Sequence, residues 1–365
     1  MSKLQKSMPT FIGEDLLTRV DPILKPGKKL HVLVTHDESI FFTNDGKKFL
    51  WHKHGDMPFY VKGHGCSLHV SDFLTETFGR LKLPVDATVT EERDLTREAC
   101  VIIKPGGNVD NWKLKDLIQQ MTKKAIPIFE TLHPGATAVF AFDQSTAHTA
   151  YASDALLVSK MNLRPGGKQP KLCCTVFNGV EQHMVFPYDH PDKDLHGQPK
   201  GMEAVLREHG LWEDRLKAKC KKCRQRDFSP ERSICCATRI LSLQPDFLSQ
   251  RPLLQEVIES FNHKIVYYPK FHCELNFIEL FWGAAKVYTR NLCDYKWSSL
   301  QKTVPEALDS VSLSQIRKYA RKTCRLMQKY RDGLTGPEAE LSEKRRSSHR
   351  CVCKSLYQNF NETLL

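Results

Sequence analysis

The sequence predicts an α/β protein in which helices flank a mixed sheet. Short apolar runs rich in β-branched residues recur along the chain, as in LHVLVT (30–35), ATAVFAF (136–142) and KIVYY (264–268), and each has the length of a buried strand. Elsewhere apolar residues repeat at helical spacing. The segment 161–263 interrupts this alternation, because Pro, Gly, Lys and Cys dominate it. A Cys-rich insertion and a basic helical C-terminal part therefore complete the expected architecture.

This pattern divides the chain into five segments. They are an N-terminal extension (1–28), the first part of the core (29–160), the Cys-rich insertion (161–263), the second part of the core (264–292) and the basic helical region (293–365). The extension is too short to fold alone, and its start lacks the uninterrupted apolar stretch of a secretory signal. No apolar run approaches the roughly 18 residues that span a bilayer, so we expect no membrane association.

The elements follow in chain order. The strand at 30–35 should end at the polar residues 36–39, and a second strand should follow at 40–43. Further predicted elements are strands at 67–73 and 100–103, a helix at 112–131 capped by Asp110 or Asn111 and kinked or shortened by Pro127, a strand at 136–142, a helix at 201–210, a strand at 264–268 and a helix at 276–290.

Charge and cysteine content narrow the class of protein. Lys and Arg outnumber Asp and Glu by 54 to 42, so the net charge of +12 favours polyanionic partners. The 13 cysteines are an odd number in a chain without an export signal. Reduced thiols or metal ligands therefore explain them better than a disulfide framework.

Three acids occupy places where carboxylates can converge on one edge of a sheet. Asp37 and Asp143 each follow an apolar strand, and Glu279 lies in the first turn of a predicted helix. Carboxylates are the ligands of hard cations, and two such ions can clamp a phosphodiester. Each acid also has a simpler explanation. An Asp after a strand is often a turn residue, and Asn276 with Glu279 fits a capping box.

Three sequence blocks carry a resemblance to a known family. THDES (35–39), FDQSTAH (142–148) and YPKFHCELNFIELFWGAAK (268–286) resemble the catalytic blocks of mariner-type DDE transposases, members of the retroviral-integrase superfamily. The similarity runs through most of 29–350 and is greatest to long fungal "DDE superfamily endonuclease" variants. Phe277 stands where the family usually has Pro.

The resemblance implies a fold, an activity and partners. It implies a ribonuclease H-like core in which Asp37, Asp143 and Glu279 hold two Mg²⁺ or Mn²⁺ ions for DNA cleavage and strand transfer. The implied partners are DNA, as transposon ends and target, and a second copy in a homodimer. It implies no small-molecule substrate. The 36 residues before Asp37 leave no room for the family's paired helix-turn-helix region, so we expect a catalytic fragment or a truncated copy.

Polar residues near these acids are further candidates. His148 can orient a phosphate or a metal-bound water, or it is an ordinary loop histidine. Glu274 can act as a backup acid, or it is a solvated loop carboxylate. Asn276 fits a helix cap better than a substrate contact.

Two clusters remain outside the acid constellation. Four cysteines, Cys220, Cys223, Cys235 and Cys236, can supply four thiolates to a structural Zn²⁺, although adjacent ligands are uncommon and Cys173, Cys174, His190 or His196 can replace one of them. The alternative is a set of reduced, partly buried thiols.

The cationic face of a helix within 312–331 is suited to DNA phosphates. Its candidate residues are Arg317, Lys318, Arg321, Lys322 and Arg325. The alternative is a solvated helix face. The later run Lys344-Arg345-Arg346, with His349 and Arg350, is typical of a nuclear import signal, so we expect a nuclear location.

Two other functions fit the same residues. One is a catalytically inactive, transposase-derived protein that only binds DNA. The other is a zinc-organised protein-interaction module for which the core is only a scaffold.

Overall fold

The computed structural model describes the chain except residues 1, 48–60, 86–95, 104–111, 226–232 and 347–365. It divides into two compact units, one of 1–148 with 257–365 and one of 149–256. The predicted caps Asp110 and Asn111, and the basic residues His349 and Arg350, lie outside the described residues. No helix in the described ranges has both the length and the apolar character that crossing a membrane requires.

The larger unit is built on a six-stranded mixed sheet, which confirms the predicted α/β class. Its strands are β3 (His31–Phe42), β4 (Ser67–Thr75), β5 (Gly79–Arg80), β6 (Val101–Ile103), β7 (Thr137–Phe142) and β10 (Lys264–Tyr267). The order is β10-β7-β3-β4-β5, with β6 also paired to β4. The β3 strand is antiparallel to β4 and parallel to β7, and β10 is parallel to β7. The strands on one side of β3 are therefore parallel to it, and its neighbour on the other side is antiparallel.

The β3 strand corrects the prediction of two short strands. It continues without a break through the polar residues 36–39, because β4 pairs with it from Val34 to Phe42. Interstrand hydrogen bonds thus outweigh the polar character of these side chains. The parallel partner β7 accompanies β3 only as far as Thr35.

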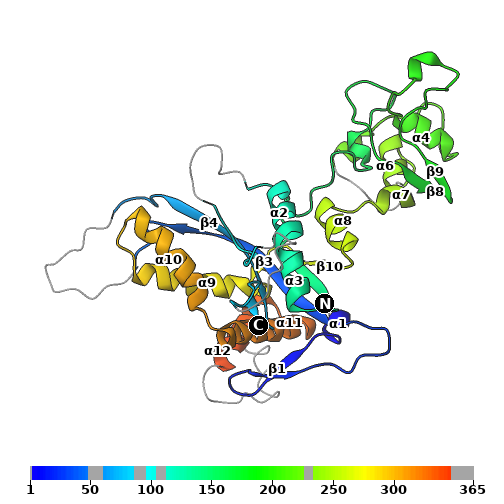
Figure 1. Cartoon of the computed structure of the whole chain (residues 1–365). Helices are drawn as coiled ribbons and strands as arrows, with labels where there is room; N and C mark the ends of the chain where they lie inside the picture. Colours follow the sequence, from blue (N-terminus) through cyan, green and yellow to red (C-terminus); the bar gives the residue numbers. More distant parts are fainter. Residues whose placement is uncertain (1, 48–60, 86–95, 104–111, 226–232, 347–365) are drawn as a thin grey trace, which may run out of the picture. The chain divides into compact units, whose positions relative to one another are not determined.

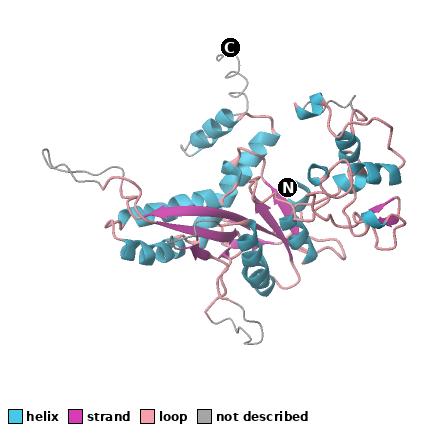
Figure 2. Cartoon of the chain, turned by 90° about the horizontal axis from the view of Figure 1, so that it is seen from above, coloured by secondary structure: helices cyan, strands magenta, loops and turns pink. Residues whose placement is uncertain are grey.

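Helices cover both faces of the sheet (Figures 1 and 2). One face carries α2 (Leu114–Gln120) and α3 (Ile126–Leu132), joined by a π-helical turn at Met121–Ala125. This continuous stretch replaces the expected kink. The π-helical turn ends just before Pro127, and a π turn accommodates a break in the ladder of helical hydrogen bonds.

Helices from the C-terminal part cover the other face. They are α9 (Ile278–Asn291), α10 (Trp297–Ser310) and α11 (Leu313–Arg331), and α12 (Gly336–Arg346) packs against α11. Phe41 and Leu68 of the sheet pack there against Phe281 and Trp282 of α9 and Leu300 of α10. Burial of these large apolar side chains holds α9 against β3.

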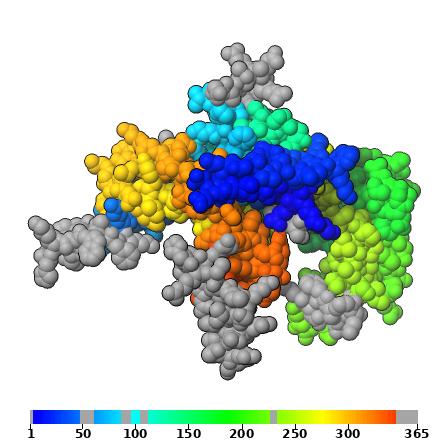
Figure 3. Space-filling model, turned by 90° about the horizontal axis from the view of Figure 1, so that it is seen from below, coloured from blue at the N-terminus to red at the C-terminus, as the bar shows by residue number. Residues whose placement is uncertain are grey.

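The N-terminal segment runs beside α11. It contains α1 (Ser2–Gln5) and a hairpin of β1 (Thr10–Ile12) and β2 (Thr18–Val20). Figure 3 shows this segment in blue beside the orange C-terminal helices, where Ser314 donates a hydrogen bond to the Asp15 carbonyl at 2.9 Å.

The second unit has little regular structure. Its elements are short: β8 (Thr175–Phe177), β9 (Val180–Gln182), α4 (Met202–Glu208), α5 (Lys221–Arg224), α6 (Ala237–Ser242), α7 (Pro245–Leu248) and the 3₁₀ turns at Val158–Lys160 and Lys193–Leu195. The helix α8 (Leu253–Ser260) crosses the boundary into the larger unit. A small apolar cluster, which includes Met202, Val205, Leu206 and Leu241, forms its core.

Candidate functional site

The three acids singled out in the sequence line one cavity of the larger unit. Its volume is about 530 Å³, and Asp37, Asp143 and Glu279 all contribute to its wall. The other lining residues are Gln144, Tyr268, Pro269, Lys270, Phe271, His272, Cys273 and Asn276. Carboxylates that are far apart along the chain therefore face one open space.

The register of the sheet brings the first two acids together. Thr35 of β3 pairs with Ala141 of β7 in a parallel ladder. Two steps further along each strand, the same register places Asp37 beside Asp143, just beyond the last paired residues. Side chains two positions apart on a strand face the same side, and neighbouring strands lie about 4.8 Å apart.

The third acid is held in place by the loop that precedes α9. The Asn276 side chain accepts a hydrogen bond from the Thr35 hydroxyl and donates one to the carbonyl of His36 at 3.1 Å. Both partners belong to β3, next to Asp37. Asn276 also serves in part as the expected helix cap, because its Oδ1 accepts a hydrogen bond at 3.4 Å from the backbone N–H of Ile278, the first residue of α9. The predicted capping box is wrong, and the Glu279 carboxylate faces the cavity instead.

Trp282 connects α9 to the first acid. Its indole Nε1 donates a hydrogen bond to the Asp37 carboxylate at 3.1 Å. Trp282 is buried in the core, as its place in the sequence predicts. Sequence analysis did not find its bond to Asp37 or single out Lys286, although both residues lie on the face of α9 that carries Glu279, three and seven positions further on. Burial raises the pKa of the Glu279 carboxyl, and the charge of Lys286 opposes part of that rise.

The acids repel one another. Burial, followed by the charges of Glu279 and Glu38, raises the pKa of Asp37 to about 8. Burial also raises the pKa of Glu279, and the charge of Asp143 adds to the shift. A group of carboxylates whose ionisation is this unfavourable has a strong electrostatic preference for a cation.

Asp143 differs, because it has a cationic partner. His148 pairs with its carboxylate through Nδ1 and lies 3.7 Å from Glu38 Oε1 through Nε2. Burial opposes protonation of His148, yet its hydrogen bonds to Asp143 and Glu38 raise its pKa to about 10. The hydrogen bond from His148 in turn lowers the pKa of Asp143. An imidazolium therefore holds the second acid in one orientation.

Glu38 belongs to the opposite face of β3. Burial alone would raise its pKa, but the imidazoles of His36 and His148 reverse the shift and hold it at about 2. His36 is buried and lies 3.8 Å from the same carboxylate, and burial lowers its own pKa to about 4. These three side chains place their ligand atoms within 4.8 Å of one another. The adjacent residues Asp37 and Glu38 of β3 therefore have pKa shifts of opposite sign.

Glu274 lies outside this arrangement. Its carboxylate accepts hydrogen bonds from His272 Nδ1 and the Tyr330 hydroxyl, both at 2.7 Å. It is not among the residues that line the cavity. Glu274 therefore links the loop before α9 to α11 rather than acting as a fourth acid at the site.

The basic helix α11 has three kinds of cation. Arg317 is buried and donates hydrogen bonds to the carbonyls of Leu16, Glu76 and Thr77. The prediction that Arg317 contacts DNA is therefore wrong, because these hydrogen bonds hold its guanidinium inside the fold. Arg325 pairs with Glu343 of α12. The described positions that remain available to a ligand are Lys318 and Arg321, which are exposed, and the half-buried Lys322.

The four candidate cysteines of the second unit come together. Cys220, Cys223, Cys235 and Cys236 have sulfur atoms that all lie within 4.8 Å of one another. Cys174, proposed as a substitute ligand, instead contacts His183 at 3.0 Å beside Glu181 on β9. This second group is exposed, and sequence analysis did not single it out.

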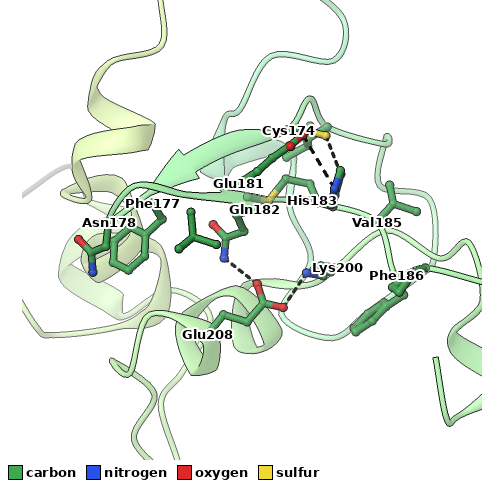
Figure 4. Close-up of a pocket in the computed structure, with 14 residues that line it drawn as sticks. Cys174, Phe177, Asn178, Glu181, Gln182, His183, Val185, Phe186, Lys200 and Glu208 are labelled. Atoms are coloured by element: carbon green, nitrogen blue, oxygen red, sulfur yellow. Dashed lines mark hydrogen bonds and ion pairs between the residues drawn. The ribbon is translucent and has the colours of Figure 1, made fainter. Parts of the chain in front are cut away.

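A larger cavity of about 810 Å³ lies in the second unit (Figure 4). Three of its polar side chains pair with one another: Glu208 accepts a hydrogen bond from Gln182 and forms an ion pair with Lys200, each at 2.6 Å. Most of its wall is apolar, and Phe177 and Val185, both labelled in Figure 4, are among the apolar residues that line it. Size alone therefore does not make it the catalytic candidate, because it lacks convergent carboxylates.

Comparisons with known proteins give a similarity to a solved structure. No family model and no curated protein matches the sequence. Among solved structures, the chain is similar to the "Crystal structure of the Mos1 mariner paired end complex with Mn", with 10% sequence identity and a TM-score of 0.37. The match covers 81% of this chain and 55% of the chain in that structure. This chain therefore spans about half the length of the chain it matches.

Proposed function

We propose that this chain is the catalytic part of a DDE transposase-type DNA endonuclease and strand transferase. The observation that carries the proposal is that Asp37, Asp143 and Glu279, from three separate elements, line one open cavity. The rise in the pKa of Asp37, caused by burial and by Glu279, supports the idea that the cavity is built for cations.

The order of the strands supports a ribonuclease H-like core. In such a core, antiparallel strands precede two parallel ones, and acids lie on the central strand, at the end of its parallel neighbour and on a following helix. The order β10-β7-β3-β4 with β5 and β6 beyond it fits that description. We further propose that the Cys-rich segment is an insertion into this core, since 149–256 forms its own unit between the two parts of the larger one.

The donor set fits Mg²⁺ or Mn²⁺. All three candidate ligands are carboxylates, which hard divalent cations prefer, and Mg²⁺ needs only one or two from the protein. Two ions held by Asp37, Asp143 and Glu279 would supply Lewis-acid activation of water and stabilise the charge that develops on the displaced oxygen. Their positive charge would also offset the repulsion that raises the pKa of Asp37.

The protein's own groups prepare this site. Trp282 fixes one oxygen of Asp37, and His148 holds Asp143. Asn276 ties the start of α9 to β3, so Glu279 stays opposite the two Asp carboxylates. The two-metal arrangement tolerates little displacement of its ligands. Trp282, His148 and Asn276 therefore act as positioning residues.

DNA is the proposed partner. The net charge of +12 and the accessible cations Lys318, Arg321 and Lys322 of α11 favour contacts to phosphates. Contacts of this kind are largely independent of DNA sequence. They would position the duplex on the protein without selecting a particular base sequence. We also propose a nuclear location from the run that begins at Lys344, and a homodimer that brings two DNA ends together.

The test combines metal binding with cleavage. Purified full-length chain is incubated with supercoiled plasmid in Mn²⁺ or Mg²⁺, and bound Mn²⁺ is measured by electron paramagnetic resonance. We expect nicking that requires the metal, and a loss of at least about 100-fold in Asp143→Asn and Glu279→Gln. Glu274→Gln is the matched control, because this nearby carboxylate does not line the cavity.

Two outcomes would contradict the proposal. One is metal-dependent nicking that survives both substitutions, since the activity would then come from elsewhere. The other is Mn²⁺ affinity equal in wild type and both variants. DNA binding without cleavage or specific Mn²⁺ binding would favour the inactive, transposase-derived protein.

A further inference from the structure

The second unit contains a cluster of four cysteines drawn from two separate segments. Cys220 and Cys223 lie at α5, and Cys235 and Cys236 directly precede α6. Cys223 and Cys236 are buried, and the other two are half-buried. Four thiols in one largely shielded place have no role in the proposed DNA chemistry.

The distances between the sulfur atoms match a tetrahedral metal site. Cys235 lies 3.7 Å from Cys220, 3.5 Å from Cys223 and 3.9 Å from Cys236, measured between Sγ atoms. With a Zn–S bond of about 2.3 Å, the edges of a tetrahedron of thiolates are about 3.8 Å long. A disulfide would instead bring two sulfurs to about 2.05 Å. The three separations agree with shared ligation of one ion.

A backbone hydrogen bond at α5 favours the thiolate form of Cys220. The backbone N–H of Cys223 donates to Cys220 Sγ at 3.5 Å. Exposed cations flank the cluster in the segment before and within α5: Arg215, Lys217, Lys219, Lys221, Lys222 and Arg224. Four thiolates around Zn²⁺ carry a net charge of −2, which a cationic segment of this kind complements.

The small amount of regular structure in this unit also favours stabilisation by a bound metal ion. Its strands have three residues each and its helices α4, α5, α6 and α7 have at most seven. Small cores with so little regular structure commonly depend on metals or disulfides for stability. The segments that carry the two cysteine pairs are already joined by hydrogen bonds, because Ala237 and Thr238 donate to the carbonyls of Lys217 and Ala218. A metal ion at the cluster would join the same two segments.

We propose that Cys220, Cys223, Cys235 and Cys236 together bind one structural Zn²⁺ that stabilises the unit 149–256. This site goes beyond the proposed nuclease function and does not depend on it. The bent backbone at Cys235 allows both members of the adjacent pair to turn their sulfurs to one side. The adjacent pair therefore contributes two ligands, with no need for Cys173, Cys174 or a histidine.

The test uses the full chain, purified under reducing conditions without added metal. Elemental analysis should find about one zinc per chain. Cys220→Ser combined with Cys223→Ser should remove it, whereas Cys173→Ser combined with Cys174→Ser should retain it. The second pair is the matched control, because it is an adjacent pair in the same unit but outside the cluster. Chelation of zinc should lower the melting temperature of wild type but not of the first variant.

Further measurements keep the proposal open to refutation if the serine variant does not fold. Wild-type chain loaded with Co²⁺ should show the intense absorption of a tetrahedral thiolate site, and Cys223→His should keep the metal with a shifted spectrum. Iron in place of zinc, loss of metal in the Cys173/Cys174 control, or a reduced wild-type chain that binds neither Zn²⁺ nor Co²⁺ would each overturn the assignment.

Discussion

Replacing Asp37 by Asn should stabilise the metal-free protein while it abolishes cleavage. The folded-state pKa of Asp37 is raised by burial and by Glu279 to about 8, against 3.8 for the free side chain. Protonation of this carboxyl therefore stabilises the fold fully below pH 3.8, and that stabilisation is lost as the pH rises through about 8. Asn cannot ionise, and its amide oxygen can still accept the hydrogen bond from Trp282.

The magnitude follows from the two pKa values. One pKa unit corresponds to about 1.4 kcal/mol, so at pH 7 the shift corresponds to at most about 4 kcal/mol of destabilisation. Asp37 is half-buried at an open cavity, where water screens its charge. We therefore expect Asp37→Asn to gain about 1–2 kcal/mol, which is a rise of about 2–8 °C in melting temperature.

The assay is thermal unfolding in chelator at pH 5 and pH 8, repeated with Mg²⁺. The advantage of Asp37→Asn should be small at pH 5 and largest at pH 8. Mg²⁺ at about 100 times its Kd should stabilise wild type by about 2.7 kcal/mol and the variant by much less. Adding metal should thus remove or reverse the difference between the two proteins.

The adjacent acid provides a control of opposite sign. Glu38 has its pKa held at about 2 by His36 and His148, against 4.5 for the free side chain. Its ionised form stabilises the fold above pH 4.5, and that stabilisation is lost as the pH falls through about 2. Glu38→Gln should therefore lower the melting temperature at pH 7. If Asp37→Asn destabilises the metal-free protein at pH 8, or if both variants shift in the same direction, the electrostatic reasoning is refuted.

The remaining predictions concern positioning and the basic helix. Asn276→Ala should cost about 2–3 kcal/mol in the free energy of unfolding by denaturant, because its buried partners on β3 lose their hydrogen bonds; an unchanged midpoint would contradict this. His148→Ala should weaken Mn²⁺ binding about 10-fold to 100-fold by freeing Asp143, and equal affinity by electron paramagnetic resonance would exclude that role. Arg317→Ala should destabilise the fold by about 3 kcal/mol without altering the salt dependence of DNA binding, whereas Lys318→Ala should reduce that dependence and leave stability unchanged.

Local pattern was enough to predict most strands of the core. The apolar runs at 136–142 and 264–268 correspond to β7 and β10 within one residue at each end. β7 is buried along its whole length, as its apolar composition predicted, whereas β10 is not the expected buried strand: it lies at the edge of the sheet, where Lys264 is exposed and the other three residues are half-buried. The sequence could not predict that β3 continues through 36–39, because there the partner strand β4, distant in sequence, supplies the hydrogen bonds.

The helix α9 shows the same division at the candidate site. Its position was evident from the sequence, but its first residue was not, because the Asn276 side chain bonds to β3 as well as to the first backbone N–H of the helix. The basic face of α11 was likewise evident, yet only packing against the N-terminal segment removes Arg317 from solvent. When a polar side chain has several potential hydrogen-bond partners, the tertiary fold determines which of them it meets.

The sequence by itself determined which residues carry chemistry: three acids after strands or at a helix start, two cysteine pairs and a row of cations. Only the tertiary structure decided which of them share a place. Parallel register sets Asp37 beside Asp143, and opposite faces of one strand give Asp37 and Glu38 pKa shifts of opposite sign. The physical reason is that desolvation and Coulomb interactions depend on distances in space, which residue order along the chain does not specify.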